Sequence, residues 1–95
     1  MQPALKQALV RRSDAVSCEL AGEAVILDMA TGQYFALDPV GSRIWDLLQH
    51  VCTPEYLCER LLDEYDVDPV ICRQDVAALL RDLVDRGLVK SEDAG

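Results

Sequence analysis

Residues 33–45 read QYFALDPVGSRIW. Residues 33–37 have the composition and alternation of a short strand. Asp38 can cap a helix N-terminus, and Pro39 suits the first helical position because its missing N–H has no partner there in any case. The stretch therefore predicts a strand that leads directly into an amphipathic helix.

Two further strands are predicted before this stretch. Val16, Cys18 and Leu20 alternate with polar residues, as in a half-buried strand. Residues 23–29 are rich in Val, Ile and Leu and form the second strand. Ala21-Gly22 can turn the chain before this strand, and Ala30-Thr31-Gly32 after it, because Gly32 tolerates a positive φ. The order predicts a three-stranded antiparallel meander over residues 16–20, 23–29 and 33–37.

Three cap-and-proline pairs mark the starts of three helices, at Asp38-Pro39, Thr53-Pro54 and Asp68-Pro69. Gly87 ends the third helix, and residues 88–90 can add a short final strand. The predicted fold class is α+β, a three-stranded antiparallel sheet followed by three helices on a winged helix-turn-helix plan. Each cap precedes an apolar stripe at helical spacing: Val40, Ile44, Leu47, Leu48 and Val51; Leu57, Leu61, Leu62 and Tyr65; and Val76, Leu79, Leu80, Leu83 and Val84.

The balance of charge disfavours a nucleic-acid partner. The 95 residues, enough for one domain, include 17 acids and 9 bases, for a formal net charge of -8. Binding to nucleic acid depends on neutralising phosphates with Lys and Arg. The helix-turn-helix plan alone suggests a DNA-binding regulator, but acids in the third helix cancel its bases: Arg73, Arg81 and Arg86 against Asp75, Asp82 and Asp85.

The sequence also disfavours a membrane protein. No run approaches the ~20 apolar residues that span a bilayer. Residues 1–10 lack the apolar centre of a signal peptide. We therefore expect a cytoplasmic protein with reduced thiols and no membrane partner.

The cysteines do not form a recognisable reactive site. Cys18, Cys52, Cys58 and Cys72 include no C-x-x-C pair, and His50 is the single histidine. Zinc sites show close ligand pairs, and a catalytic Cys–His pair needs an orienting partner. We interpret the cysteines as small apolar residues and predict no metal, no cofactor and no enzymatic activity.

An ordered set of short motifs runs through nearly the whole chain, over about residues 15–90. Its core is Tyr34-x-x-Leu-Asp-x-x-Gly-x-x-Ile-Trp45, and the remaining pieces are Glu23, Leu27-Asp28, Gly32-Gln33, Tyr65-Asp66-Val67, Asp75-Val76, Leu83 and Gly87-Leu88-Val89. The set resembles the family of the D protein of pyrroloquinoline quinone biosynthesis, the PqqD-like recognition element of ribosomally made, modified peptides. This resemblance divides the chain into an N-terminal extension over 1–14, expected to be mobile in part, a recognition domain over 15–90 and a polar tail over 91–95.

The resemblance implies a function in peptide capture. In such proteins the leader peptide of a precursor docks as an extra strand on the third strand, against the third helix. The length implies a free-standing module, similar to the leader-binding proteins of lasso peptide clusters, which work beside a leader-cleaving cysteine protease. The quinone branch of the same family, and partnership with another modifying enzyme, remain as alternatives.

The residues support peptide capture on physical grounds. The outer N–H and C=O groups of the predicted last strand, Gln33, Tyr34, Phe35, Ala36 and Leu37, can pair with an added strand. Alternation places Phe35 and Leu37 toward the helices, whereas Tyr34 lies on the other face, as a solvated aromatic or framing the groove. The alternative is a strand that only completes its sheet, since open edges are normally protected.

The third helix is expected to form the other wall of the groove. Ala77 is small enough to admit a bulky leader side chain, and Arg73 and Arg81 can pair with leader carboxylates. The alternative is that the arginines are solvated, as in an Arg81–Asp85 pair. Trp45 is interpreted as a core residue rather than a ligand-stacking one. The candidate wall comprises Arg73, Val76, Ala77, Leu80 and Arg81.

Overall fold

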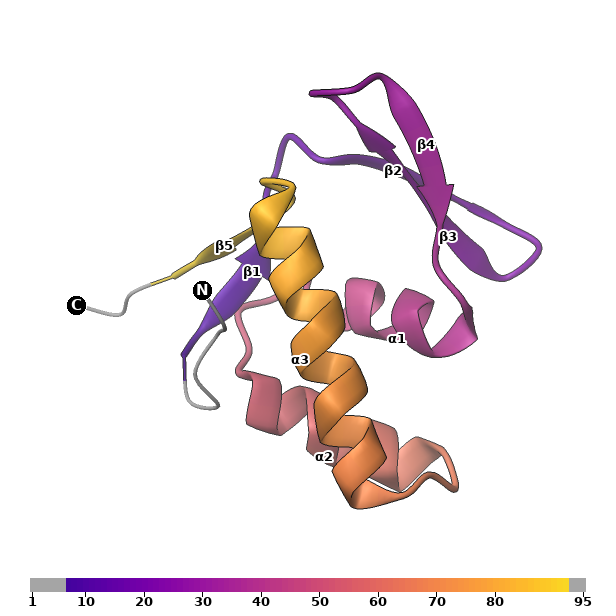
Figure 1. Cartoon of the computed structure of the whole chain (residues 1–95), viewed down its shortest axis with the longest axis vertical. Helices are drawn as coiled ribbons and strands as arrows, with labels where there is room; N and C mark the ends of the chain where they lie inside the picture. Colours follow the sequence, from indigo (N-terminus) through magenta and orange to yellow (C-terminus); the bar gives the residue numbers. More distant parts are fainter. Residues whose placement is uncertain (1–6, 93–95) are drawn as a thin grey trace.

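The computed structural model describes residues 7–92 (Figure 1). An antiparallel sheet in the order β2-β3-β4 precedes three helices, so the predicted α+β fold is confirmed. None of the helices described is long and apolar enough to cross a membrane. The strands are β2 (Val16–Leu20), β3 (Glu23–Asp28) and β4 (Gln33–Ala36), and the helices are α1 (Pro39–Leu47), α2 (Pro54–Glu64) and α3 (Pro69–Asp85).

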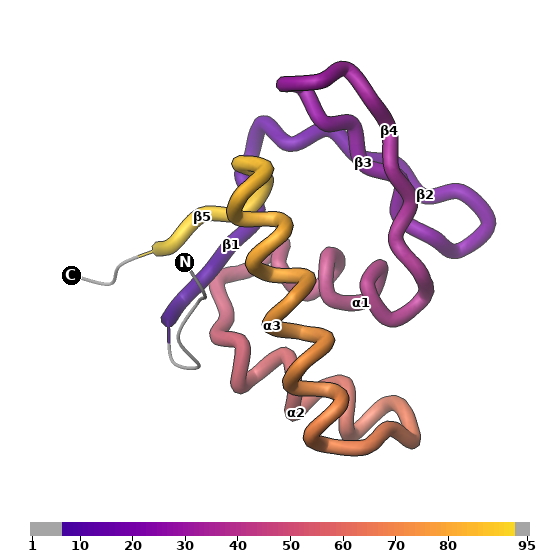
Figure 2. Tube along the Cα trace, in the orientation of Figure 1, coloured from indigo at the N-terminus to yellow at the C-terminus, as the bar shows by residue number. Residues whose placement is uncertain are grey.

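The predicted short final strand is present and belongs to a second, two-stranded sheet, whose other strand the sequence analysis missed. β1 (Leu9–Arg11) pairs antiparallel with β5 (Val89–Ser91), which brings the two ends of the described chain side by side (Figure 2). Leu9 is 1% exposed and belongs to the core. The fold thus begins within the expected extension of 1–14. β1 was not predicted because a three-residue strand is too short to show alternation and its partner lies at the far end of the chain. Residues 1–6, and residues 93–95 of the expected polar tail, lie outside the described part.

The inner face of the sheet packs on α1. Ile26 of β3 is fully buried and lies opposite Phe35 of β4. Trp45 of α1 is 3% exposed, and its indole N–H donates to the Ser17 hydroxyl at 3.0 Å. The Arg11 guanidinium lies 5.0 Å from the centre of the Trp45 ring. The interpretation of Trp45 as a core residue is therefore confirmed.

Three details of the predicted pattern are wrong. Leu62, placed in the apolar stripe of the second helix, is 37% exposed. All five residues of β2 are exposed. The register pairs Ser17 with Ile26 on the inner face, so the apolar Val16, Cys18 and Leu20 lie on the outer face. Val51, placed in the apolar stripe of the first helix, is 53% exposed. α1 ends at Leu47, before the helical spacing can carry that stripe to residue 51.

All three predicted helix caps are present. The Asp38 carboxylate accepts from the backbone N–H of Gly41 at 2.7 Å. Thr53 accepts from the N–H of Tyr56 at 3.1 Å, and Asp68 accepts from two N–H groups at the start of α3. Each cap satisfies donors that a helix N-terminus leaves free, so local sequence sets where all three helices begin.

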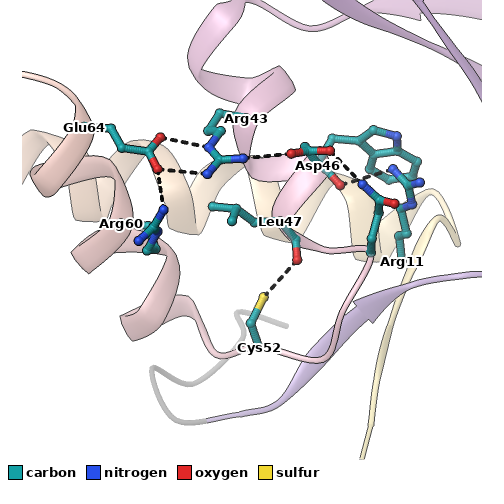
Figure 3. A network of polar contacts seen from close by, with 9 residues as sticks. Arg11, Arg43, Asp46, Leu47, Cys52, Arg60 and Glu64 are labelled. Atoms are coloured by element: carbon teal, nitrogen blue, oxygen red, sulfur yellow. Dashed lines mark hydrogen bonds and ion pairs between the residues drawn. The ribbon is translucent and has the colours of Figure 1, made fainter.

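An ionic cluster joins α1 to α2 (Figure 3). Arg43 of α1 donates two hydrogen bonds to the Glu64 carboxylate of α2, at 2.8 and 2.9 Å, and pairs with Asp46 at 2.7 Å. Arg60 donates to the same Glu64 carboxylate at 2.9 Å. The hydrogen bonds from Arg43, followed by its charge and that of Arg60, lower the pKa of Glu64. This two-pronged contact orients α1 relative to the C-terminal end of α2.

Replacing Glu64 with Gln tests this cluster. The pKa of Glu64 in the folded protein lies below its ordinary value of 4.5. The contribution of Glu64 to the free energy of unfolding is therefore fully present above its pKa in the unfolded state, and it is lost as pH falls through its pKa in the folded state. We expect Glu64→Gln to lower the free energy of unfolding at neutral pH, and the deficit to shrink on acidification. Urea unfolding between about pH 7 and about pH 3 measures it. Asp63→Asn, at a neighbouring exposed carboxylate, is the control, and an equal pH-dependent deficit there would contradict the assignment.

Candidate functional site

One edge of the sheet is open along β4. β4 pairs with β3 on one side, and no described strand lies on the other. The backbone N–H of Leu37 donates to the carbonyl of Ala24 in the strand β3 at 2.9 Å. Because hydrogen-bonded positions alternate along an antiparallel ladder, the N–H and C=O groups of Tyr34 and Ala36 are directed toward the open edge. Two residues of β4 can thus accept an added strand without losing a bond to β3.

A cavity of about 510 Å³ lies where β4 ends, between α1, the end of α2 and α3. Its lining comes from the end of β4 and the turn that follows it, from α1 and α2, and from one face of α3. The lining residues are Ala36, Leu37, Asp38, Val40, Gly41, Ile44, Leu61, Tyr65, Val67, Ile71, Cys72, Asp75, Val76 and Leu79. The open edge and the cavity together form one surface, which we call the β4–α3 groove.

The cavity is mainly apolar and has two charged lining residues, Asp38 and Asp75. Asp38 is engaged in capping α1. Asp75 is exposed, and its carboxylate makes no hydrogen bond or ion pair with any other described residue. Burial raises the pKa of the Cys72 thiol, with Asp75 adding in the same direction and a hydrogen bond from Cys58 opposing. The thiol is therefore held protonated, as expected for an apolar wall rather than a nucleophile.

Gly41, which lines the cavity, allows the turn from β4 to pack closely against the first turn of α1. A Cβ there would lie 3.1 Å from an Asp38 carboxylate oxygen, 3.3 Å from the Leu37 Cβ and 3.5 Å from a methyl of Leu79. The first two distances are tighter than ordinary side-chain contacts. Ser42, next along α1, accepts from the N–H of Ala24 at 2.8 Å and donates to the carbonyl of Leu37 at 3.2 Å. These contacts join the end of β4 to the start of α1.

Arg86, just after α3, ties the sheet to that helix. Its guanidinium lies 4.7 Å from the centre of the Phe35 ring in β4. It pairs with Asp28 of β3 and with Asp82 of α3, each at 3.1 Å. Asp28 is 4% exposed and also accepts from the N–H of Ala30 at 3.0 Å. Hydrogen bonding to Asp82, and then its charge, raise the pKa of Arg86, so the cation is fixed between the two elements.

The predicted strand residues lie where the sequence analysis placed them. Gln33–Ala36 form β4, with Leu37 directly after it. Leu37 is buried and Phe35 packs against the core, whereas Tyr34 is 68% exposed on the other face. Ala36 and Leu37 also line the cavity. Their role in binding remains a prediction.

The predicted wall on α3 is only partly brought to the groove. Val76 lines the cavity, and Ala77 is half-buried outside it. Leu80 is fully buried in the core, and Arg81 is exposed away from the cavity lining. Arg73 lies on another side of α3, in a small hollow beside α2. The helix phase explains the difference, because burying the core residues of α3 turns a different face toward β4.

That other face carries the residues that sequence reasoning missed. Ile71, Asp75 and Leu79 are spaced four residues apart, which places them on one side of a helix. Asp82 and Arg86 continue the same side toward β4. The available signal was Ile71, an apolar residue on the same side of the helix as Leu79 that the predicted core stripe leaves out. Among the described residues, no group of three or more His, Cys, Asp or Glu side chains could hold a metal ion.

Comparison with known proteins places the chain in a family. Residues 23–89 match coenzyme PQQ synthesis protein D (PqqD). The chain belongs to the PqqD family. The resemblance to a PqqD-like recognition element is therefore confirmed. No curated protein shows significant similarity to this PqqD-family chain.

Two solved structures share the fold of the PqqD-family chain and contain a bound peptide. TbiB1 in complex with the TbiA(beta) leader peptide is 36% identical, with a TM-score of 0.75 over 88% of this chain and 98% of TbiB1. A lasso peptide synthetase B1 complexed with the leader peptide is 25% identical, with a TM-score of 0.70 over 86% of this chain and 96% of the other. Each is thus matched over almost its full length.

Replacing Arg86 with Ala tests its role in joining sheet and helix. The substitution leaves the buried Asp28 carboxylate without its ionic partner and uncovers Phe35. We expect the free energy of unfolding to fall, because the buried Asp28 carboxylate loses its charged partner. Arg81→Ala, an arginine of α3 with no ion pair to another described residue, is expected to change it by less than about 0.5 kcal/mol. Urea denaturation of both variants measures the difference, and equal losses would show that Arg86 makes no special contribution.

Proposed function

We propose that this chain binds the leader peptide of a ribosomally made precursor, most specifically a lasso peptide precursor. The leader adds to β4 as an extra strand and lies in the β4–α3 groove. The protein is an adaptor without catalytic activity that delivers the bound precursor to a leader-cleaving cysteine protease or another modifying enzyme. The observation that carries the proposal is the open edge of β4 beside an apolar cavity, in a chain 36% identical to one solved with a leader peptide.

The geometry supports both affinity and selectivity. Main-chain bonds to Tyr34 and Ala36 supply affinity that does not depend on leader sequence. The cavity at the end of β4 supplies selectivity, because it accepts apolar side chains from one face of the added strand. Its volume of about 510 Å³ suits one or two large side chains.

The two branches of the family make different predictions about the ligand. The family description points to quinone cofactor synthesis, whereas both leader complexes are similar over most of the chain and one is named as a lasso peptide synthetase. We favour the lasso branch for this reason. Titration with leaders of both precursor classes separates the two.

DNA binding is the weaker candidate function. Arg86 is already paired with two carboxylates, so it is not free to contact phosphate. Asp75 and Asp82 lie on the face of α3 turned toward β4. Retention on duplex DNA that falls steeply with salt would reverse this ranking.

Ala36→Pro tests strand addition directly. Proline removes the N–H that points to the open edge while leaving the bonds to β3 in place, and an edge position tolerates it. We expect affinity for the TbiA(beta) leader peptide to fall about tenfold or more, since the variant loses a main-chain bond and its ring obstructs the approaching strand. Isothermal titration calorimetry measures the change.

Glu19→Pro is the matched control. Glu19 is exposed on β2, at the opposite edge of the sheet, and the same alternation directs its N–H outward. This variant should bind the leader as the unchanged protein does. Equal weakening in both variants, with both still folded by circular dichroism, would rule out addition at β4 in particular.

A further inference from the structure

We propose that Asp75 selects a leader that presents a lysine or arginine side chain to the β4–α3 groove. This inference rests on the proposed function and assigns a charge preference to the same site. Asp75 is the lining carboxylate without a structural task, since Asp38 caps α1. It was not among the candidate site residues from the sequence.

The charges around the groove favour a basic ligand. The cavity lining contains two acids and no base. The arginines expected at the groove lie elsewhere, Arg73 in the hollow beside α2 and Arg81 outside the cavity lining. Arg86 is neutralised by Asp28 and Asp82. A leader carboxylate would therefore meet negative charge without a counter-ion.

The shape of the site suits a long basic side chain in particular. Ile71 and Leu79 flank Asp75 one helical turn before and after it. The methylenes of lysine or arginine can cover such apolar surface while the charged end reaches a carboxylate. A strand added to β4 directs alternate side chains to the inner face shared by Phe35 and Leu37, and Leu37 lines the cavity together with Asp75.

A charge-swap titration tests the inference. The probes are the TbiA(beta) leader peptide and two sets of variants, with lysine or glutamate placed at each successive position. At one position the unchanged protein should bind the lysine variant about fivefold to tenfold more tightly than the glutamate variant. Asp75→Lys should reverse that preference at the same position, and Asp75→Asn should remove it. The preference should also weaken as salt rises, since the pair is exposed.

Asp63→Lys controls for net charge. It makes the same change of charge on the exposed outer side of α2, away from the cavity. It should keep the lysine preference at that position. If it reverses the preference as Asp75→Lys does, the effect is one of overall charge and the inference is wrong.

The remaining outcomes separate this inference from the proposed function. If the unchanged protein binds leaders but the lysine-to-glutamate ratio at every position is the same in the Asp75 variants, the charge preference is overturned and leader binding stands. If no leader from either precursor class binds the unchanged protein, leader binding itself is overturned, and the charge preference with it.

Discussion

The Arg86 bridge is the interaction on which the candidate site depends most. One guanidinium covers Phe35 of β4, neutralises the buried Asp28 of β3 and pairs with Asp82 of α3. A buried carboxylate without such a partner is costly, so the sheet and the C-terminal end of α3 are held in one arrangement. That arrangement sets the separation between the open strand and the helix beside it. The groove is therefore a consequence of packing at one of its ends.

The other end of the groove is held by capping and close approach. Asp38 caps α1, Ser42 joins β3 and the end of β4 to that helix, and Gly41 leaves room for Leu37. The Arg43–Glu64 contact then orients α1 against α2.

An open edge is normally a hazard for aggregation. Here the strand is four residues long, which limits the template that it offers to chance partners while leaving two residues available for a ligand.

Local signals in the sequence predicted most of the fold. The caps at Asp38, Thr53 and Asp68 follow from short-range hydrogen bonding, which depends on neighbouring residues alone. The same holds for the meander, whose turns and apolar strands are contiguous. β1 could not be predicted, because it depends on β5 at the opposite end of the chain. The exposure of β2 was missed because alternation shows that a strand has two different faces but does not say whether other elements cover either of them.

The sequence by itself determined the order of the elements from β2 to β5, the strand residues at the candidate edge and the family. Tertiary structure decided which face of α3 meets β4. A helix with a broad apolar stripe can be rotated by a fraction of a turn without violating its pattern, and only packing against the other elements selects one rotation. Burial of Leu80 and Leu83 made that selection. It moved Arg73 and Arg81 away from the groove and placed Asp75 there, which changed the expected charge of the wall from basic to acidic.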